Sequence, residues 1–589
     1  MQKRSHSCGQ LRPEHVGQTV RLAGWVNGYR DHGGVVFIDL RDREGLTQIV
    51  FHPEHKEAHD LADRLRHEDV VFVEGACVAR EEGMANPKLP TGAIEVDATH
   101  VEILNKSETP PFTPDDADRT GEEHRLKHRY IDLRRPRMQQ IIRTRHRVMQ
   151  TMRRYLDGHG FTEIETPFLC RSTPEGARDF LVPSRLQHGS FYALPQSPQL
   201  FKQILMVAGC ERYMQIVRCF RDEDPRADRQ AEFTQLDLEM SFIDMEDVVE
   251  LVSGLARAVW KEVLGLDVGD IPRMTYADAV GRFGSDRPDL RFGMELIDVS
   301  DLATQTTFNV FRSAVEKGGI VKCIVVPGGG TKMSRKDTDA LAEWVKQFGA
   351  GGLPTCKVEG GKLTTGVAKF LEPVAAALIE RTGAKEGDLV CFGVDSRAAV
   401  AHRVLGELRV KIAHDLKMIA EGQWKWLWVV DFPLMEYNEQ EKRWDSLHHP
   451  FTAPRDEDVA LMDQDPSKVR SKAYDLVLNG SEIAGGSIRI HRPEVQQKVF
   501  SLLGINEEAA KGKFGFLLDA LRYGAPPHGG LACGLDRWVM HLVGTTNIRD
   551  VIAFPKTQNG ADLMSAAPAP VDDRQLRDLH IRVVEPAAK

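Results

Sequence analysis

QIVRCFRDEDPRADRQAEFTQLDLEMSF, residues 215–242, is the stretch that decides the fold. Two apolar-rich segments flank a charged loop, Arg221 to Glu232, in which arginines are mixed with carboxylates. The second segment alternates between apolar and polar side chains, with Leu236, Leu238, Met240 and Phe242 in one set and Gln235, Asp237, Glu239 and Ser241 in the other. Period-two alternation predicts an antiparallel strand with one apolar and one polar face. A carboxylate-bearing sheet face beside arginines, whose forks suit phosphates, either binds a charged ligand or simply faces water.

Length and composition exclude some broad classes of protein. A chain of 589 residues predicts several domains, and 28% charged with 42% hydrophobic residues is ordinary for a soluble globular protein. No apolar run approaches the ~20 residues of a membrane span, and MQKRSHSCGQ lacks the apolar core of a signal peptide. We therefore expect a cytoplasmic protein with no membrane partner. Nine scattered cysteines without C-x-x-C spacing predict reduced thiols and no zinc ribbon.

The N-terminal third divides into a strand-rich part and a helical part. Residues 1–104 carry short strands separated by Gly-rich turns, which predicts a small β-barrel, an OB-fold. Residues 105–140 are a linker or hinge, which starts with the Pro-rich NKSETPPFTPDD, and a basic helix is expected at about 138–158. The net charge of −9 indicates nothing about nucleic acid, but nine arginines lie between Lys127 and Arg154. This run is either a solvated helix face or a surface that contacts phosphates.

The remaining chain predicts one domain interrupted by another. Residues 141–287 and 415–565 look like halves of one α+β domain with an antiparallel sheet, because both combine polar-alternating strands with Gly-rich loops. Between them, residues 288–414 predict an inserted α+β domain, and residues 566–589 form a C-terminal extension. The glycines of PGGGTKMS read as turn residues, because the Gly-Lys-Ser/Thr order of a phosphate loop is missing. The expected fold class is multidomain.

LPQSPQLFKQILMVAG, residues 194–209, predicts a helix. Ser197 suits the N-cap, Pro198 the first position and Gly209 the end. Gln199 and Lys202 lie on one face of the first turns. The buried stripe is expected to consist of Phe201, Ile204, Leu205 and Ala208. A lysine in the first turn opposes the helix dipole, which favours an anionic partner for it.

Two later stretches carry residues suited to phosphates and metal. In AYDLVLNGSEIAGGSIRIHR, residues 473–492, Asp475 and Glu482 flank an Asn-Gly turn. They could hold Mg²⁺ together with phosphate oxygens, or they could be surface charges of an ordinary hairpin. In PPHGGLACGLDRWVMHLVG, residues 526–544, glycines permit close backbone approach, and Arg537 begins a helix as a plausible triphosphate contact.

Taken in order, these pieces resemble a known family. GFTEIETPFL, FRDEDPRADRQAEFTQLDLEMSF and GLACGLDRWVM resemble the three signature motifs of class II aminoacyl-tRNA synthetases. TPEGARDF, QSPQLFKQ, HHPFTAP and GGSIRIHR are similar to the aspartyl-tRNA synthetases among them, and the insertion at 288–414 resembles that of the bacterial form. The resemblance runs from Cys8 to about Met564. It implies ATP-dependent attachment of L-aspartate to tRNA through aspartyl-adenylate, with Mg²⁺ as cofactor.

The resemblance also implies roles for individual residues. Glu175, Gln199 and Asp237 would hold the ammonium group of aspartate, and Arg489 and Lys202 its side-chain carboxylate. The full aspartate site comprises Glu175, Gln199, Lys202, Arg221, Asp237, His448, His449 and Arg489. Arg221 would bind the α-phosphate, Phe233 would stack on adenine and Arg537 would bind the γ-phosphate. The full ATP site comprises Arg221, Asp222, Glu223, Gln230, Phe233, Glu482, Gly534, Leu535, Asp536 and Arg537, and the metal would lie on Asp475 and Glu482.

The barrel is similar to the family's anticodon-binding domain. In VVFIDLRD, Phe37 alternates with Val36, Ile38 and Leu40, so it is either an outward aromatic that could stack on an anticodon base or an aromatic turned into the barrel. Arg30 and Gln48 match family contacts. His32 and Gly83 occupy the two places that mark non-discriminating synthetases, which charge both tRNA-Asp and tRNA-Asn. An amidotransferase would then have to convert Asp-tRNA-Asn. The surroundings of Pro167 match the motif that builds a homodimer.

Other interpretations stay open at this point. Asparaginyl- and lysyl-tRNA synthetases share the barrel and core, but the insertion and GGSIRIHR speak against both. The enzyme could be strictly discriminating, with His32 and Gly83 as ordinary turn residues. A noncatalytic RNA-binding paralogue should have lost Arg221, Arg537 or the Asp475–Glu482 pair, and all are present.

Overall fold

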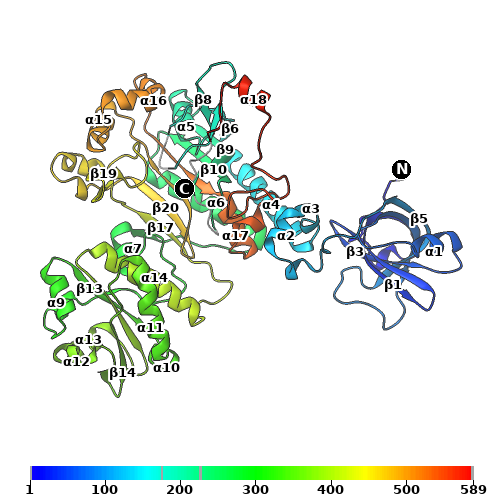
Figure 1. Ribbon diagram of the computed structural model, residues 1–589, viewed down its shortest axis with the longest axis horizontal. Coiled ribbons are helices and arrows are strands. Elements are labelled where there is room, and N and C mark those ends of the chain that lie inside the picture. The colour runs from blue at the N-terminus through cyan, green and yellow to red at the C-terminus, as the bar shows by residue number, and fades with distance from the viewer. Residues whose placement is uncertain (1–2, 174–176, 224–227, 585–589) are drawn as a thin grey trace. The chain divides into compact units, whose positions relative to one another are not determined.

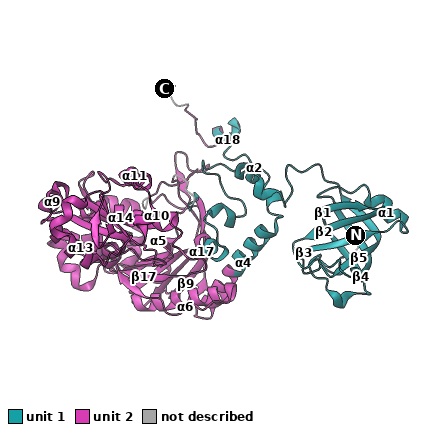
Figure 2. Ribbon diagram, turned by 90° about the horizontal axis from the view of Figure 1, so that it is seen from below, with its two compact units in different colours: residues 1–147, 224–231, 539–576 teal, residues 148–223, 232–538, 577–589 magenta. Residues whose placement is uncertain are grey.

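The computed structural model describes residues 3–173, 177–223 and 228–584. The chain forms two compact units, whose elements are labelled in Figure 1 and which are coloured separately in Figure 2. Unit 1 holds residues 1–147, 224–231 and 539–576, and unit 2 holds residues 148–223, 232–538 and 577–589. Over the described residues, no helix is long and apolar enough to cross a membrane. All nine cysteines are free thiols.

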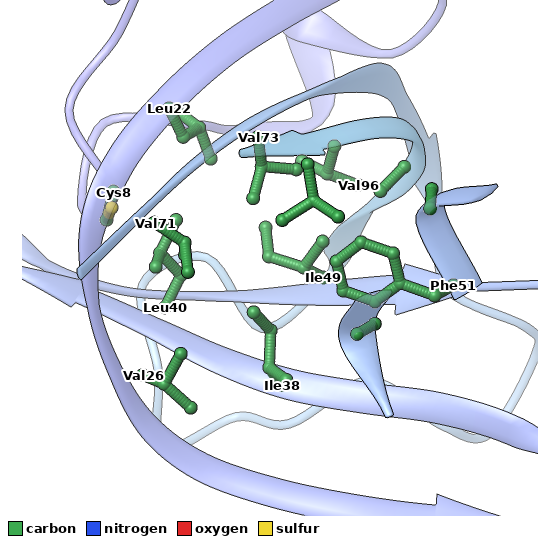
Figure 3. Close-up of a cluster of buried hydrophobic side chains, with 14 of the residues drawn as sticks. Cys8, Leu22, Val26, Ile38, Leu40, Ile49, Phe51, Val71, Val73 and Val96 are labelled. Atoms are coloured by element: carbon green, nitrogen blue, oxygen red, sulfur yellow. The ribbon is translucent and has the colours of Figure 1, made fainter. Parts of the chain in front are cut away.

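Unit 1 contains the predicted OB-fold. Five strands close into a barrel in the order β1-β2-β3-β5-β4. Their bounds are β1 Thr19–His32, β2 Val35–Asp42, β3 Gly45–Phe51, β4 Val70–Ala79 and β5 Ile94–Asn105. Alternate residues of each strand point inward, so that Val26, Ile38, Ile49 and Val96 meet in a dry core (Figure 3). The same alternation leaves Phe37 part-exposed on the outer face, which decides between the two orientations left open by the sequence.

The basic run has a third explanation that the sequence did not show. The predicted basic helix is α4 (Pro136–Asp157), which is preceded by the short helices α2 (Glu122–Lys127) and α3 (Arg129–Asp132). Arg129 is 2% exposed and donates to Asp132 and to three backbone carbonyls, and Arg134 binds the buried Glu68. These arginines join segments of unit 1 to one another and do not form a free face.

Unit 2 is built on a mostly antiparallel sheet of eight strands in the order β11-β17-β20-β21-β22-β10-β9-β6. The strands are β6 Thr162–Glu163, β9 Arg212–Phe220, β10 Glu232–Ser241, β11 Arg273–Thr275, β17 Trp426–Val430, β20 Ala473–Leu478, β21 Ser481–Ile488 and β22 His528–Gly534. The predicted alternation in β10 holds up to Ser241, but Phe242 departs from it. Its φ is +60° and it is 69% exposed, because the chain turns left-handed to donate its N–H to Pro527.

The strands of the large sheet come from two stretches of the chain, 162–275 and 426–534, and a second sheet of unit 2 uses only residues between them. Its order is β12-β13-β16-β14-β15, with β12 Ile297–Asp298, β13 Ile320–Val326, β14 Thr355–Glu359, β15 Lys362–Thr364 and β16 Leu389–Asp395. We call this part the inserted sheet. One sheet drawn from two distant segments, with another sheet between them, is what the proposed insertion requires; the domain boundaries themselves stay a prediction. Two short hairpins complete the strands, β7 Leu181–Pro183 with β8 Phe191–Ala193 and β18 Met435–Asn438 with β19 Arg443–Ser446.

The helices cover these sheets and the barrel. The α-helices not yet named are α1 Lys56–Ala62, α5 Gln199–Val207, α6 Met245–Leu264, α7 Tyr276–Phe283, α8 Ser300–Ala303, α9 Asn309–Glu316, α10 Gly329–Lys332, α11 Arg335–Trp344, α12 Ala368–Leu371, α13 Ala375–Thr382, α14 Ala398–Asp415, α15 Pro493–Leu502, α16 Glu507–Leu521, α17 Leu535–Val543 and α18 Asp573–Asp578. The 3₁₀ helices are η1 Pro13–His15, η2 Ala117–Arg119, η3 Val345–Phe348, η4 Glu372–Val374, η5 Asp456–Asp463, η6 Pro466–Lys468 and η7 Ile548–Val551.

Candidate active site

A row of directly opposed residues crosses four strands of the large sheet. Asp475 on β20 pairs with Gly485 on β21, Gly485 with Ala532 on β22, and Ala532 with Asp237 on β10. Opposed residues share a face, so two carboxylates stand at the ends of a row whose middle members are small. With strands about 4.8 Å apart, the two backbones are roughly 14 Å apart. In this row the sheet face between the two carboxylates therefore carries no bulky side chain of its own.

Helix α5 lies over this face, and the sequence-based prediction of its buried stripe was wrong. Phe201, Ile204 and Leu205 are only part-buried and Ala208 is exposed, whereas the buried positions are Gln199, Leu200, Lys202, Gln203 and Met206. The polar residues are inward because the sheet face under α5 is itself charged. The helix also begins one residue later than predicted, at Gln199, whose N–H is 3.3 Å from Ser197 Oγ. Gly209 follows its end, as predicted, with φ of +81°.

Four buried charges form the centre of the candidate site. Lys202 Nζ donates to Asp237 Oδ1 at 2.8 Å and lies 3.3 Å from Glu239 Oε2. Arg489 Nε donates to Glu239 Oε1 at 2.9 Å, and its other bonds go to Glu239 Oε2, Ser487 Oγ and Gly530 O. All four side chains are at most 4% exposed. Two cations and two carboxylates thus balance one another in a low-dielectric region.

We call Lys202, Asp237, Glu239 and Arg489 the quartet. Several buried polar atoms in or beside the quartet have no hydrogen-bond partner within the described structure. They are Asp237 Oδ2, Gln199 Nε2 and Gln203 Nε2. In addition, the four bonds of Arg489 leave one of its five guanidinium N–H groups without a described acceptor. A buried carboxylate oxygen and buried N–H donors left unsatisfied are expensive, and a ligand that carries an ammonium group and a carboxylate would satisfy both kinds.

The pKa values of the two carboxylates of the quartet are shifted in opposite directions. Burial raises the pKa of Asp237, and Lys202 only partly opposes this effect. Burial acts in the same direction on Glu239, but Arg489 and Lys202 outweigh it and hold the pKa of Glu239 below its ordinary value. Asp237 is therefore the carboxylate whose ionised form stands to gain most from a cationic ligand group beside Oδ2.

This difference predicts a pH dependence of aspartate binding. A ligand ammonium beside Asp237 favours its ionised form, so binding is strongest above the raised pKa of the free protein and weakens as pH falls through that value. We expect calorimetric titration to show a rising Kd for L-aspartate as pH is lowered from neutrality through the acid range in which the protein stays folded. Asp301→Asn, a change at an exposed site, should keep this profile. A Kd that stays constant over the range would contradict the assignment.

The Asp475–Glu482 pair lies on the predicted hairpin, whose turn has Asn479 at φ +52° and Gly480 at φ +82°. A Cβ placed on Gly485 would lie 2.5 Å from Asp475 Oδ1 and 3.2 Å from Glu482 Oε1, so both carboxylates converge over this glycine. The negative charge of Asp475, and then burial, raise the pKa of Glu482. Two hard oxygen donors that repel each other over open space fit a divalent cation such as Mg²⁺.

His448 stands beside this pair. Its Nε2 lies 3.7 Å from Asp475 Oδ2. Burial opposes the imidazolium, but Asp475 outweighs this effect and, with Glu482 and Asp286, raises the pKa of His448. His449, its neighbour, accepts at Nδ1 from the N–H of Phe451 at 3.2 Å. The structure therefore places His448 with the carboxylate pair, while His449 shapes the loop.

Most of the residues expected to bind ATP lie in unit 2, and two pairs of them are in contact. Arg221 lies over the ring of Phe233, with 5.1 Å from Cζ to the ring centroid, and Arg537 Nη1 donates to Glu482 O at 2.8 Å. Leu535 is fully buried, and Asp536 is committed to the N–H of Thr234. Three expected positions remain. Asp222 forms an isolated β-bridge with Arg178, and Gly534 pairs with Gln235 between β22 and β10. Glu223 is the last residue of a described segment of unit 2.

One residue expected in the ATP site and one expected in the aspartate site are not placed with the others. Gln230 belongs to unit 1, where its Oε1 accepts from the N–H of Lys556 at 2.9 Å. Glu175 lies outside the described residues.

The expected anticodon residues lie on the outer face of the barrel. Arg30 Nη2 donates to Gln48 Oε1 at 3.1 Å and to Asp39 Oδ1 at 3.2 Å, and Gln48 in turn donates to Glu95. Phe37 is opposite Arg30 in the β1–β2 register. His32 ends β1 and is exposed. Nothing described lies within 4 Å of a Cβ placed on Gly83, so His32 and Gly83 do not pack together.

Sequence reasoning missed three residues of the site. Glu239 was seen as part of the polar face but not as the partner of Arg489, and Gln203 and His528 were not seen at all. His528 is fully buried, with Nδ1 2.8 Å from Pro526 O and Nε2 3.3 Å from Gln203 Oε1. The polar position of Gln203, one after Lys202, was the available signal, whereas the pairing with His528 joins segments 325 residues apart.

Comparisons with known proteins agree across the chain. Residues 121–558 match the family described as tRNA synthetases class II (D, K and N), and residues 20–104 match the OB-fold nucleic acid binding domain. The aspartate–tRNA ligase of Staphylococcus carnosus is 52% identical over 587 residues, 99% of this chain and 100% of that protein. The aspartate–tRNA(Asp/Asn) ligase of Halothermothrix orenii is 54% identical over 584 residues, 99% of this chain and 98% of that protein.

Solved structures show the same fold at much lower identity. The asparaginyl-tRNA synthetase from Pyrococcus horikoshii, complexed with asparaginyl-adenylate, has a TM-score of 0.59 at 20% identity and covers 95% of this chain and 99% of its own. A putative aspartyl-tRNA synthetase from Leishmania major has a TM-score of 0.58, also at 20% identity, over 94% of both chains.

Proposed function

Because this chain belongs to the class II tRNA synthetases of the D, K and N group, we propose that its charged sheet face activates L-aspartate with ATP. The overall activity is that of an aspartate–tRNA ligase, the activity for which full-length relatives at 52–54% identity are named. A noncatalytic paralogue is not supported by these relatives. In the proposed reaction the quartet binds aspartate, and the Asp475–Glu482 pair binds the metal.

The reaction needs positioning and charge, and no protein nucleophile. The α-carboxylate of aspartate attacks the α-phosphorus of ATP, the bond to the β-phosphate breaks, and pyrophosphate leaves. The terminal ribose hydroxyl of tRNA then attacks the aspartyl carbonyl, and AMP leaves with the former acyl–phosphate oxygen. Arg221 and Arg537 hold the phosphates at either end, and Phe233 stacks on adenine. Asp475 and Glu482 would hold Mg²⁺, which would supply further positive charge to the phosphate oxygens.

The unsatisfied buried groups around Lys202 and Arg489 are the observation that carries this proposal. Asp237 Oδ2 is an acceptor for the substrate ammonium, and the spare N–H of Arg489 is a donor for the side-chain carboxylate. Asparagine would turn NH₂ donors towards a site that offers cations, which a site built for polar pairing can reject by about 10⁴.

The proposal is tested by ATP–pyrophosphate exchange with the purified protein. Exchange should depend on L-aspartate and should be absent with L-asparagine at equal concentration. Equal exchange with the two amino acids, or exchange that needs neither, would overturn the assignment of the site.

We also propose that the enzyme charges tRNA-Asn. Two features support this: relatives such as the Halothermothrix orenii protein are named aspartate–tRNA(Asp/Asn) ligase, and His32 and Gly83 are both present. The anticodons differ only at the third base, C in tRNA-Asp and U in tRNA-Asn, so discrimination needs a group that reads one donor-for-acceptor exchange. Gly83 offers no side chain near that base, and the open space around it tolerates either.

Aspartylation of tRNA-Asn is expected within roughly tenfold of tRNA-Asp in kcat/KM, a gap of ~1.4 kcal/mol. His32→Leu with Gly83→Lys should widen the gap by about tenfold or more, because it adds bulk and a cation that can distinguish the bases. Gly83 has φ of +83°, so lysine there costs about 1 kcal/mol of loop strain, and kcat/KM on tRNA-Asp serves as the control. A preference of about a thousandfold in the unmutated enzyme would show it to be discriminating.

Charging of both tRNAs has a consequence for partners, and the surface suggests a further one. Asp-tRNA-Asn must be amidated before it can serve translation, so we propose that an amidotransferase consumes it.

We also propose a homodimer through the surface around Pro167, where Phe168 is 45% and Leu169 53% exposed. Exposed large apolar side chains next to each other are typical of an interface. Light scattering at micromolar concentration should give the dimer mass, and Leu169→Glu should shift it towards the monomer.

A further inference from the structure

The chain that leads into the inserted sheet is clamped by one buried arginine. Arg409 on α14 is 1% exposed. Its guanidinium donates to the carbonyls of Asp289 and Gly293 at 3.0 Å, of Met294 at 3.3 Å and of Phe292 at 3.4 Å. It also lies between the rings of Phe283 and Phe292, at 5.0 and 4.4 Å from their centroids. One side chain thus fixes the whole incoming segment, which we define as residues 289–294.

Arg409 keeps its positive charge at neutral pH although it is buried. Burial lowers its pKa to about 10, so it is still cationic at neutral pH. Its bonds go to backbone carbonyls, and α14 packs closely enough that a Cβ on Gly406 would lie 2.5 Å from Gly284 O at the end of α7. A planar five-donor fork held against carbonyls and two rings sets a geometry that a flexible cation could not.

The incoming segment rests on the turn of the Asp475–Glu482 hairpin. Asp289 is 4% exposed, and Arg291 fixes its carboxylate at 2.6 Å. A Cβ placed on Gly480 would lie 3.0 Å from the Cβ of Asp289, so only glycine lets the two segments approach this closely.

The chain that leaves the insertion holds the other side of the same turn. Asn479 N–H donates to Lys425 O at 3.1 Å, Lys425 N–H to Asn479 Oδ1 at 2.9 Å, and Asn479 Nδ2 to Gln423 O at 2.8 Å. Trp424, between these two, packs edge-on against the buried Trp260 at 5.7 Å. The turn is therefore held between the incoming segment and this outgoing segment, residues 423–425.

We infer that Arg409 is a positioning residue for adenylate formation: through the incoming segment it fixes the hairpin turn and hence the spacing of Asp475 and Glu482. The inference rests on the proposed function for its catalytic consequence only. Asp475 lies four residues before Asn479, and Glu482 two residues after Gly480, so a displaced turn would shift the strand ends that carry the two carboxylates. Three members of the quartet lie on β10 and α5, and the fourth, Arg489, is the residue after β21, so the quartet lies away from the turn.

Two variants and two readouts test this inference. In Arg409→Met, which keeps length but removes all donors, hydrogen–deuterium exchange of the hairpin amides 476–483 should be about tenfold faster. In ATP–pyrophosphate exchange, the Mg²⁺ concentration for half-maximal rate should rise about fivefold, while KM for aspartate stays within about twofold. Arg409→Lys, which keeps the charge but not the fork, should fall between Arg409→Met and wild type. Arg381→Met, at an exposed ion pair with Asp301 beside the same inserted sheet, should change neither readout.

The outcomes separate positioning from general destabilisation. The inference is overturned if the hairpin amides exchange at the wild-type rate in Arg409→Met, or if KM for aspartate rises in proportion to the Mg²⁺ requirement. Should Arg409→Met not fold, Arg409→Lys decides by the same criteria. Amide exchange needs no turnover, so an unmutated protein without aspartate-dependent activity would refute the proposed function and leave the hairpin readout intact.

Discussion

Arg489→Leu is expected to lower kcat/KM for aspartate in ATP–pyrophosphate exchange by about 10⁴. The guanidinium is the group that both completes the buried quartet and keeps an N–H for the substrate carboxylate. Leucine offers neither charge nor donor, and the substrate carboxylate would then lose its solvation without an adequate partner. Substrate-dependent exchange over a wide aspartate range measures the loss.

The same substitution has a stability cost that must be separated from the catalytic one. Glu239 is fully buried, and removal of Arg489 leaves Lys202 at 3.3 Å as its cation, so unfolding should become easier by up to about 3–5 kcal/mol. Arg489→Lys keeps a positive charge near Glu239 and should recover most of the thermal stability, but not the activity. Arg381→Leu is the matched control for loss of an arginine. Near-normal exchange by a folded Arg489→Leu protein would refute its role.

Glu482→Gln is expected to slow adenylate formation by about 10²-fold at limiting Mg²⁺, with partial recovery at high Mg²⁺. The amide preserves the size of the side chain but removes half of the negative charge of the pair over Gly485 that we propose holds the metal. Single-turnover adenylate formation across a Mg²⁺ titration measures the effect.

Stability should move in the opposite direction to activity in this variant. Asp475 raises the pKa of Glu482 through like-charge repulsion, so an uncharged residue at 482 relieves the folded state and Tm should not fall. Glu316→Gln, at an exposed position on α9, controls for the loss of a carboxylate. A wild-type Mg²⁺ titration would show that Glu482 does not hold the metal.

Local pattern predicted those parts of the molecule in which one face is apolar. The barrel, the alternation of Leu236, Leu238 and Met240 and the Asn479–Gly480 turn follow from residues close in sequence. The pattern failed where burial is decided by a distant partner. On α5 the inward residues are polar, because Lys202 meets carboxylates of β10 that are 35 and 37 residues away.

Ion pairs and covered backbone explain the other differences. Neither a solvated face nor a phosphate surface describes Arg129 and Arg134, since their partners lie in segments that the sequence does not bring together. Phe242 ends the alternation because its backbone is left-handed, which an apolar pattern cannot reveal. Roles taken from family resemblance, such as those of Arg221 and Phe233, agree with the observed proximity but stay to be tested by substitution.

The neutral quartet limits how the substrate preference of this enzyme can be redesigned. Lys202 and Arg489 cancel Asp237 and Glu239, and in the proposed binding mode aspartate would add one ammonium and one side-chain carboxylate, so the filled pocket would stay neutral there. Asparagine brings the ammonium alone and would leave an uncompensated positive charge in a dry site. An asparagine-specific variant therefore requires the removal of one cation without stranding a carboxylate. Replacing Arg489 together with Glu239 would leave Lys202 and Asp237 in balance and the extra positive charge uncompensated, whereas replacing Arg489 alone would restore neutrality only by leaving Glu239 with Lys202 as its single cation.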